Sequence, residues 1–258
     1  MAKAKHEYKA LTNNNQKLGT EIRVLNFGPS VDPDVCVLEA SKTNPDDESC
    51  DVENRCYNDN LESVFKTLRL RLEWLKQQDP ETIVEMAIGE LNIALRFSRV
   101  MWFRISVNGS VPTYPSAKLI SLLRDMLGML RIADVAVHFP VETRKKAERY
   151  SKHLSDLCVV RASVSYGRFI NADYAASYVV KRRYQTPKQK LAVTRKFLLH
   201  DGLAVKANCQ GDRVAIICPF EAFVAKHNCK IAQVPWQHKC TACKACSDDT
   251  KQIIFLDT

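Results

Sequence analysis

Hydrophobic and polar positions follow two patterns along the chain, one typical of strands and one typical of helices. Short apolar runs, such as residues 100–107 and 158–165, have the length of buried strands. Longer stretches, such as residues 61–75, repeat their apolar positions every three or four residues, as amphipathic helices do. The expected strands cover residues 22–25, 100–107, 134–139, 158–165, 203–207 and 213–218, and the expected helices cover about 59–75, 79–95, 116–130, 143–157 and 186–198.

The alternation of strands and helices predicts an α/β fold with a parallel sheet and crossover helices. We expect a partial or irregular (β/α) barrel whose functional loops follow the carboxyl ends of its strands. An open α/β sheet with a metal-bound tail is the alternative. The predicted barrel-like domain covers residues 1–217 and contains a cysteine loop at 31–58, and residues 218–258 form a C-terminal cysteine-rich metal-binding segment. Residues 166–180 show no clear pattern.

Composition is that of a globular protein in a reducing compartment. The chain has 258 residues, 46% of them hydrophobic, which is enough to bury a substantial core. Its ten cysteines are too few for a small disulfide scaffold and too clustered to be random core residues. The polar N-terminus and the lack of a long apolar run predict no signal peptide and no membrane span. We therefore expect a cytoplasmic location.

Three cysteines near the end of the chain, Cys240, Cys243 and Cys246, follow one another at C-x-x-C spacing. This spacing can turn three thiolates to one side of a tight loop and bind three corners of an iron–sulfur cube. Cys218 is the expected fourth ligand, because it ends an apolar run and precedes a proline. Cys229 is the rival fourth ligand.

Zinc is the main competitor of an iron–sulfur cluster for these cysteines. Sites with four cysteines, or with three cysteines and a histidine, also use C-x-x-C, and His227 and His238 are near in sequence. The overlapping triplet is commoner in clusters, so a [4Fe–4S] cluster is the favoured cofactor and zinc the alternative. Free or disulfide-bonded cysteines are the third interpretation.

Basic residues gather at 181–206, where eight lysines and arginines stand against one acid, Asp201. Such a segment is either a footprint for a polyanion, such as nucleic acid, or a solvated helix face. It is the predicted contact with a nucleic acid or a host protein.

Single residues within the predicted strands also have candidate roles. Arg104 and Arg161 interrupt apolar strands, so each either faces the interior and binds an anion or pairs with an acid, or lies solvated at an edge. His138 is placed near a strand end, as a catalytic residue or a satisfied core residue. Cys158 and Cys209 are expected to be small buried hydrophobic residues.

Several short stretches resemble the phage gene product 88 family of uncharacterised proteins, which in turn is similar to radical S-adenosylmethionine enzymes. They are NQKLG, the loop ending in Cys56-Tyr57, FRISVNGS, ICP, KCTACKAC and IIFL. The resemblance covers most of the chain in order, and its cysteines are its distinctive part. It implies a phage-encoded protein with one cysteine loop after the first strand and a second cysteine group at the C-terminus.

The resemblance also assigns ligands. Cys36, Cys50 and Cys56 match the N-terminal ligands, at a wider spacing than the compact C-x-x-x-C-x-x-C of a radical-generating cluster. Three ligands on one cubane leave one iron open for S-adenosylmethionine, which is a possible cofactor. Because of the wide spacing, zinc or a structural cluster is the favoured occupant of this first site. The C-terminal ligands match Cys218, Cys240, Cys243 and Cys246. The resemblance implies cofactor binding at Asn108, Gly109 and Ser110, where Ser110 replaces the acid that usually follows the glycine. Arg104 is a further candidate for cofactor binding because it interrupts an apolar strand.

Two classes of function follow from these predictions. One is an iron–sulfur enzyme with radical chemistry on a nucleotide or nucleic acid. The other is a non-catalytic protein, stabilised by zinc or a cluster, that binds a host protein or nucleic acid in the host cytoplasm.

Overall fold

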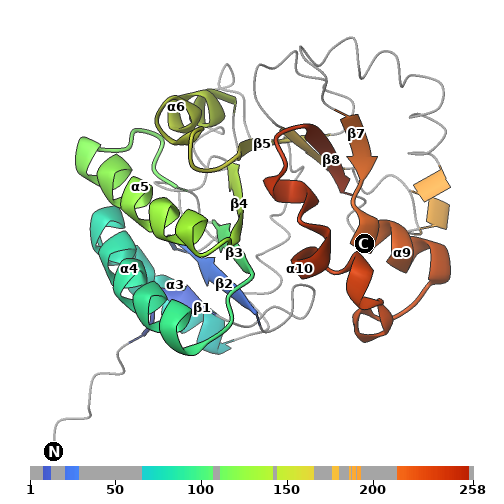
Figure 1. The fold of residues 1–258 in the computed structure, drawn as a ribbon, viewed down its shortest axis with the longest axis horizontal. Coiled ribbons are helices and arrows are strands. Elements are labelled where there is room, and N and C mark those ends of the chain that lie inside the picture. Colours follow the sequence, from blue (N-terminus) through green and yellow to red (C-terminus); the bar gives the residue numbers. More distant parts are fainter. Residues whose placement is uncertain are drawn as a thin grey trace, which may run out of the picture.

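The strands form one sheet that is almost entirely parallel. The computed structural model describes residues 8–12, 21–28, 66–106, 111–141, 144–165, 176–179, 186, 188–189, 191–192 and 214–255. Within these residues the sheet has eight strands in the order β1-β2-β3-β4-β5-β6-β8-β7, and only the β1–β2 pair is antiparallel (Figure 1). The expected α/β fold with a parallel sheet is confirmed. The strands are β1 Leu11–Thr12, β2 Ile22–Leu25, β3 Trp102–Ile105, β4 Ala136–Val141, β5 Val160–Ser165, β6 Ala176–Val179, β7 Val214–Ile217 and β8 Lys251–Phe255.

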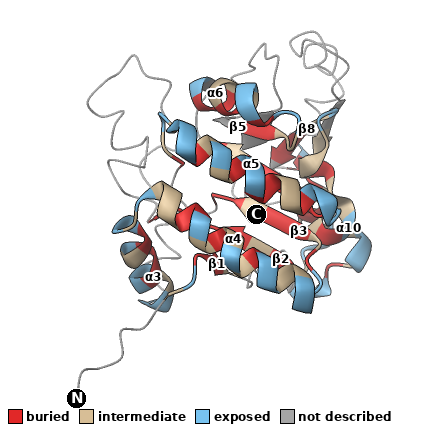
Figure 2. Cartoon of the chain, turned by 60° about the vertical axis from the view of Figure 1, so that its left-hand side comes forward, coloured by how far each residue is buried: buried red, intermediate tan, exposed pale blue. Residues whose placement is uncertain are grey.

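The helices α4, α5 and α6 lie together on one face of the sheet. Figures 1 and 2 show α4, α5 and α6 on the same face, as expected when neighbouring parallel strands follow chain order and every crossover is right-handed. Their apolar stripes pack on the strands; Val84 and Leu91 of α4 and Leu127 of α5 are fully buried. The helices are α3 Lys66–Lys76, α4 Pro80–Phe97, α5 Ala117–Ile132, α6 Arg144–Leu154, α9 Pro219–His227 and α10 Cys240–Cys243, with 3-10 turns η1 Ile231–Gln233, η2 Trp236–His238 and η3 Ala245–Ser247.

Helix starts follow the signals in the sequence. Pro80 opens α4 directly after Asp79, which suits the fixed backbone angle of proline in a first turn. Ser116 caps α5, because its Oγ accepts a hydrogen bond from the N–H of Leu119 at 2.9 Å. The same Oγ donates to Glu81 at 2.5 Å, which joins the starts of α4 and α5.

The opposite face of the sheet is covered by the C-terminal segment. Side chains alternate between the two faces of a strand, so Ile22, Val24 and Trp102 point away from the helices. These three form a buried cluster against which Cys240 and Cys246 pack. The chain leaves the sheet at β7, passes through α9 and α10, and returns as β8 between β6 and β7. Residues 218–255 thus contact the sheet in two ways: Cys240 and Cys246 pack on its face, and β8 is one of its strands. The division of the chain into two parts at residue 217 stays a prediction.

The described strands correspond to the sequence patterns at five places and depart from them at others. The expected strands at 22–25, 100–107, 134–139, 158–165 and 213–218 are confirmed as β2, β3, β4, β5 and β7. The patternless stretch 166–180 contains β6, and β1, β8 and α9 were not expected. The strand expected at 203–207 lies outside the described residues.

Two features are absent from the described part of the chain, a closed barrel and a helix that could cross a membrane. Among the described strands, no hydrogen-bonded pair joins β7 to β1, so no closed barrel is present in this part of the chain. None of the described helices combines the length and apolar character needed to cross a bilayer.

Candidate metal centre

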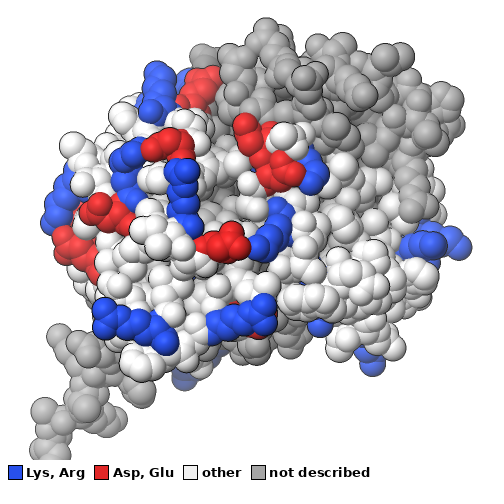
Figure 3. Space-filling view, in the orientation of Figure 1, with Lys and Arg blue, Asp and Glu red and all other residues white. Residues whose placement is uncertain are grey.

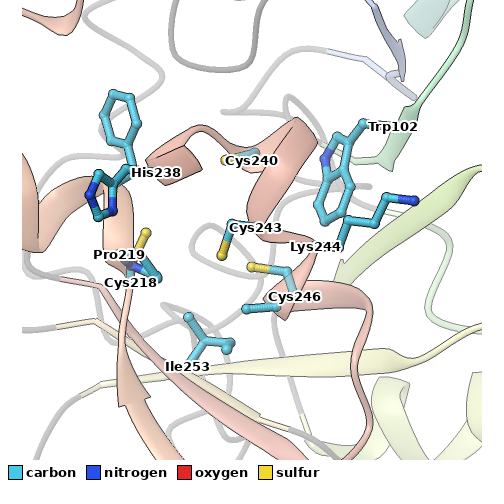
Figure 4. A pocket seen from close by; sticks show the side chains of 11 residues that line it. Trp102, Cys218, Pro219, His238, Cys240, Cys243, Lys244, Cys246 and Ile253 are labelled. Carbon is cyan, nitrogen blue, oxygen red and sulfur yellow. The ribbon is translucent and has the colours of Figure 1, made fainter. Parts of the chain in front are cut away.

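Four cysteines from the C-terminal segment line one pocket. Cys218 follows β7, Cys240 and Cys243 begin and end α10, and Cys246 lies in η3. Figure 4 shows the four side chains around a common space, with Trp102 on its far side from Cys218. The structure thus brings together all four C-terminal ligands that the sequence predicted.

Cys218 is held by the sheet on one side and by a helix on the other. Its N–H donates to the carbonyl of Ile254 in β8 at 2.8 Å, which continues the β7–β8 ladder. Its carbonyl accepts from the N–H of Ala222 at 2.9 Å, the first turn of α9. The apolar run before it supplies the strand, and Pro219 after it starts the helix. Cys218 is consequently buried, at 5% exposed.

The triplet turns back on itself through Lys244. This residue has φ 49° and ψ 9°, in the left-handed region, and its N–H donates to the carbonyl of Cys240 at 3.1 Å. A left-handed residue ends a helix and reverses the chain direction. The reversal returns Cys246 to the pocket that Cys240 and Cys243 already line.

Arg161 of β5 fixes the chain after the triplet. Its side chain is fully buried, and Nε donates to the carbonyl of Cys246 at 2.6 Å. Nη1 donates to the carbonyl of Lys251 at 2.7 Å, and Nη2 donates to that of Asp248. The sequence left open whether Arg161 faces the interior or lies solvated at an edge, and the structure places it in the interior. Its role there is to hold the backbone between η3 and β8.

Burial sets the protonation of the thiols. Burial raises the pKa of Cys246 to about 12, the nearby Cys240 adds to the rise, and the charges of Arg161 and Arg104 act in the opposite direction. A thiol with this pKa is protonated at neutral pH, and a metal ion would displace its proton on binding. Burial likewise raises the pKa of Cys158 to about 12. The sequence predicted a buried side chain at this position, and the structure shows a partly buried one that packs against the main core.

The four thiols are the kind of side chain that binds a metal centre. Their present spacing, however, matches neither a zinc ion nor an iron–sulfur cubane. The pocket has a volume of about 20 Å³, room for about one water molecule. Within the described residues, no three Cys, His, Asp or Glu side chains converge closely enough to bind one ion as they stand. A zinc ion needs its ligand atoms at about 2.0–2.3 Å, so the thiols would have to draw together. A cubane carries its thiolates on separate corners, so the pocket would have to widen.

The rival ligands lie at different distances from the pocket. His238 lines it, and its ring centroid is 4.9 Å from that of Phe223. Cys229 packs against the apolar cluster that contains Cys218, outside the set of side chains that line the pocket. His227 stacks on the same Phe223, with ring centroids 4.3 Å apart. Cys218 is therefore better placed than Cys229 as the fourth ligand, and His238 is the better placed histidine.

No family model, no curated protein and no solved structure matches the chain. The resemblance to the phage gene product 88 family stays a prediction.

Several predicted site residues lie outside the described part of the chain. They are Cys36, Cys50, Cys56, Asn108, Gly109, Ser110 and Cys209. Within the basic segment 181–206, only residues 186, 188–189 and 191–192 are described; Lys188 is exposed there. Figure 3 shows basic and acidic side chains interspersed on the side of the molecule where the helices α4 and α5 lie in Figure 1. One pair of opposite charge among the described residues is Arg124–Asp156, at 2.7 Å.

Three side chains of β3 and β4 face the C-terminal segment. Arg104 lies opposite His138 in the register, and Trp102 lies two residues before Arg104 on the same face. His138 is 5% exposed, and its ring centroid is 6.4 Å from that of Trp102. The expectation that His138 sits near a strand end is wrong, because pairing with β5 extends β4 to Val141. Trp102 is the pocket residue that the sequence reasoning missed, because its apolar surroundings indicated only a core strand.

Proposed function

We propose that the chain binds a metal centre through Cys218, Cys240, Cys243 and Cys246, and that its occupant is a [4Fe–4S] cluster. One observation carries the proposal: four cysteines from three parts of the C-terminal segment, the end of β7, α10 and η3, line a single pocket. The overlapping C-x-x-C triplet supports a cluster over zinc, since three thiolates on one loop suit three corners of a cube. Zinc held by the same four cysteines, or by three of them and His238, is the alternative occupant.

The surrounding residues each have a defined task in this proposal. A bound cluster supplies either one-electron transfer or a structural cross-link. Arg161 holds the backbone at Cys246, and its positive charge, with that of Arg104, offsets the negative charge that four thiolates bring into the interior. Phe220 and Ile253, both buried, line the pocket and keep water from the ligands.

Metal analysis of anaerobically purified protein tests the proposal. We expect the wild-type chain to carry iron and acid-labile sulfide and to be brown. Cys243→Ser should lose most of the metal, because a missing corner ligand releases the cluster. Cys158→Ser is the matched control, since this cysteine packs in the other core and should leave the metal content unchanged. Zinc without sulfide would identify the alternative occupant, and full metal content in Cys243→Ser would refute the site.

A radical S-adenosylmethionine-like enzyme is the second candidate function. The parallel strands β2 to β6 follow chain order with α4, α5 and α6 on one face, an arrangement that supports a partial (β/α) barrel. The predicted cysteine loop 31–58 comes after β2 in the sequence, and the predicted turn at 108–110 comes after β3. The carboxyl ends of parallel neighbours lie at the same edge of a sheet, so these two segments leave the sheet on the side where such folds place their sites.

A cleavage assay tests this second candidate. The enzyme hypothesis predicts that reconstituted protein, given dithionite and S-adenosylmethionine without oxygen, forms 5′-deoxyadenosine. Cys56→Ala is the control, because losing one of three ligands removes a cluster instead of retuning it. Equal amounts of 5′-deoxyadenosine from the wild type and from Cys56→Ala, with the wild type at full metal occupancy, would contradict the enzyme hypothesis. The remaining proposal would then be a metal-stabilised protein that binds a host protein or nucleic acid through residues 181–206.

A further inference from the structure

Trp102 presents a buried hydrogen-bond donor to the cysteine pocket. Its side chain is 2% exposed, and Nε1 has no hydrogen-bond partner among the described residues. Buried side-chain donors are nearly always paired, so an unpaired one calls for an explanation. Tryptophan has no other polar atom, and this N–H can only donate.

The position of Trp102 connects it to the triplet. It is the first residue of β3, on the face turned away from the helices, where Cys240 and Cys246 pack against its cluster. It lines the same pocket as all four cysteines. In the view of Figure 4 the triplet lies between the indole and Cys218, and the indole nitrogen is on the edge of the ring nearer Cys240.

We infer that the indole N–H of Trp102 donates a hydrogen bond to a metal-bound thiolate of the triplet, Cys240 or Cys246. The inference rests on the metal centre proposed above. A protonated thiol is a weak acceptor, whereas a metal-bound thiolate carries negative charge and accepts strongly. The donor therefore finds its partner only when the centre is occupied. Trp102 is a positioning and tuning residue of the centre, and it is not a ligand.

Such a bond changes the electronic properties of the centre. Hydrogen bonds to the sulfurs of an iron–sulfur cluster help to set its reduction potential. The reduced cluster carries one more negative charge, so a donor to its thiolate stabilises the reduced state more than the oxidised state. Trp102 thus raises the reduction potential. For zinc, the same bond would draw electron density from the thiolate and lower its reactivity.

Trp102→Phe tests this inference in the full chain, because phenylalanine keeps most of the ring and removes the N–H. Trp236→Phe is the matched control, since Trp236 is 53% exposed. At equal iron content, we expect the midpoint potential to fall in Trp102→Phe and to stay unchanged in Trp236→Phe. An unchanged potential in Trp102→Phe would overturn the bond while leaving the cluster in place. Iron absent from the wild type would overturn the proposed cluster itself.

A zinc centre has an equivalent test with cobalt(II) in place of zinc. Loss of the donor raises the energy of the thiolate electrons, so the thiolate-to-cobalt charge-transfer band should move to longer wavelength in Trp102→Phe alone. A band at the wild-type wavelength would count against the bond.

A measurement on the wild-type chain covers the case in which Trp102→Phe fails to fold or to retain metal. With ¹⁵N-labelled indoles, the N–H signal of Trp102 should shift and exchange more slowly with solvent after metal is added, whereas those of Trp74 and Trp236 should not. A Trp102 signal that is indifferent to metal would contradict the inference.

Discussion

Arg161 positions the backbone of the cysteine segment and is itself not a candidate ligand. A fully buried guanidinium is costly unless its donors are satisfied, and here they reach the carbonyls of Cys246, Asp248 and Lys251. Three bonds from one rigid, planar group fix the position of the chain between η3 and β8. The sequence indicated only that a charged residue interrupts an apolar strand. Its partners lie more than eighty positions away, and nothing local specifies them.

Replacing Arg161 should therefore loosen the cysteine segment. Arg161→Met keeps the length and apolar stem of the side chain and removes its donors. We expect the free energy of unfolding to fall by about 3 kcal/mol, because several charge-assisted hydrogen bonds to buried carbonyls are lost. Denaturant unfolding measures this change. Arg124→Met is the control: its pair with Asp156 is exposed and should contribute little. Equal stability of the two variants would contradict the positioning role of Arg161.

At the scale of elements, predictability followed the local strength of the pattern. The strands β3, β4 and β5 were found because each is an apolar run of strand length, and α4 and α5 because each has a regular apolar stripe. By contrast, β6 lies in a stretch without a clear pattern, and β8 is defined by pairing on both sides with strands distant in the chain. Pairing between remote segments leaves no periodic signal in either of them. The cysteine triplet was visible because its spacing is local, whereas Trp102 joins the pocket only through the packing of β3 against that segment.

The cap shared by α4 and α5 gives a prediction at this scale. Ser116→Ala removes the cap of α5 and the hydrogen bond to Glu81, so we expect a loss of about 1 kcal/mol in unfolding free energy near neutral pH. The hydrogen bond from Ser116 lowers the pKa of Glu81 below its usual 4.5. A group with a lowered folded pKa stabilises the fold above its unfolded pKa and loses that effect as pH falls through the folded value.

The penalty of Ser116→Ala should thus shrink as the pH falls below about 4.5, the unfolded value. Unfolding curves of both proteins at several pH values measure this dependence. Lys118→Ala, which removes the exposed pair with Glu85 on the neighbouring turn, serves as the control and should change stability less. A Ser116→Ala penalty that is the same at every pH would exclude the link to Glu81.

At the scale of the whole molecule, the cysteine pocket lies between two parts of the sheet that are distant in the strand order. Trp102 belongs to the N-terminal half of the sheet, and Cys218 follows the edge strand β7 at the other end of the strand order. The segment that contains the triplet spans the space between them and returns as β8. A metal bound there would link both halves of the sheet, so its binding free energy would contribute directly to folding.

X-ray absorption at the metal edge tests this central claim most directly, because it reports the atoms bound to the metal in the intact protein. Anaerobically prepared wild-type protein should show a first shell of sulfur only at about 2.3 Å, with a second shell of iron if the occupant is a cluster. The Cys218→Ser protein should show a weaker sulfur shell or lose its metal, and Cys229→Ser should match the wild type. A first shell of oxygen and nitrogen, or a change in Cys229→Ser but not in Cys218→Ser, would contradict the four-cysteine centre.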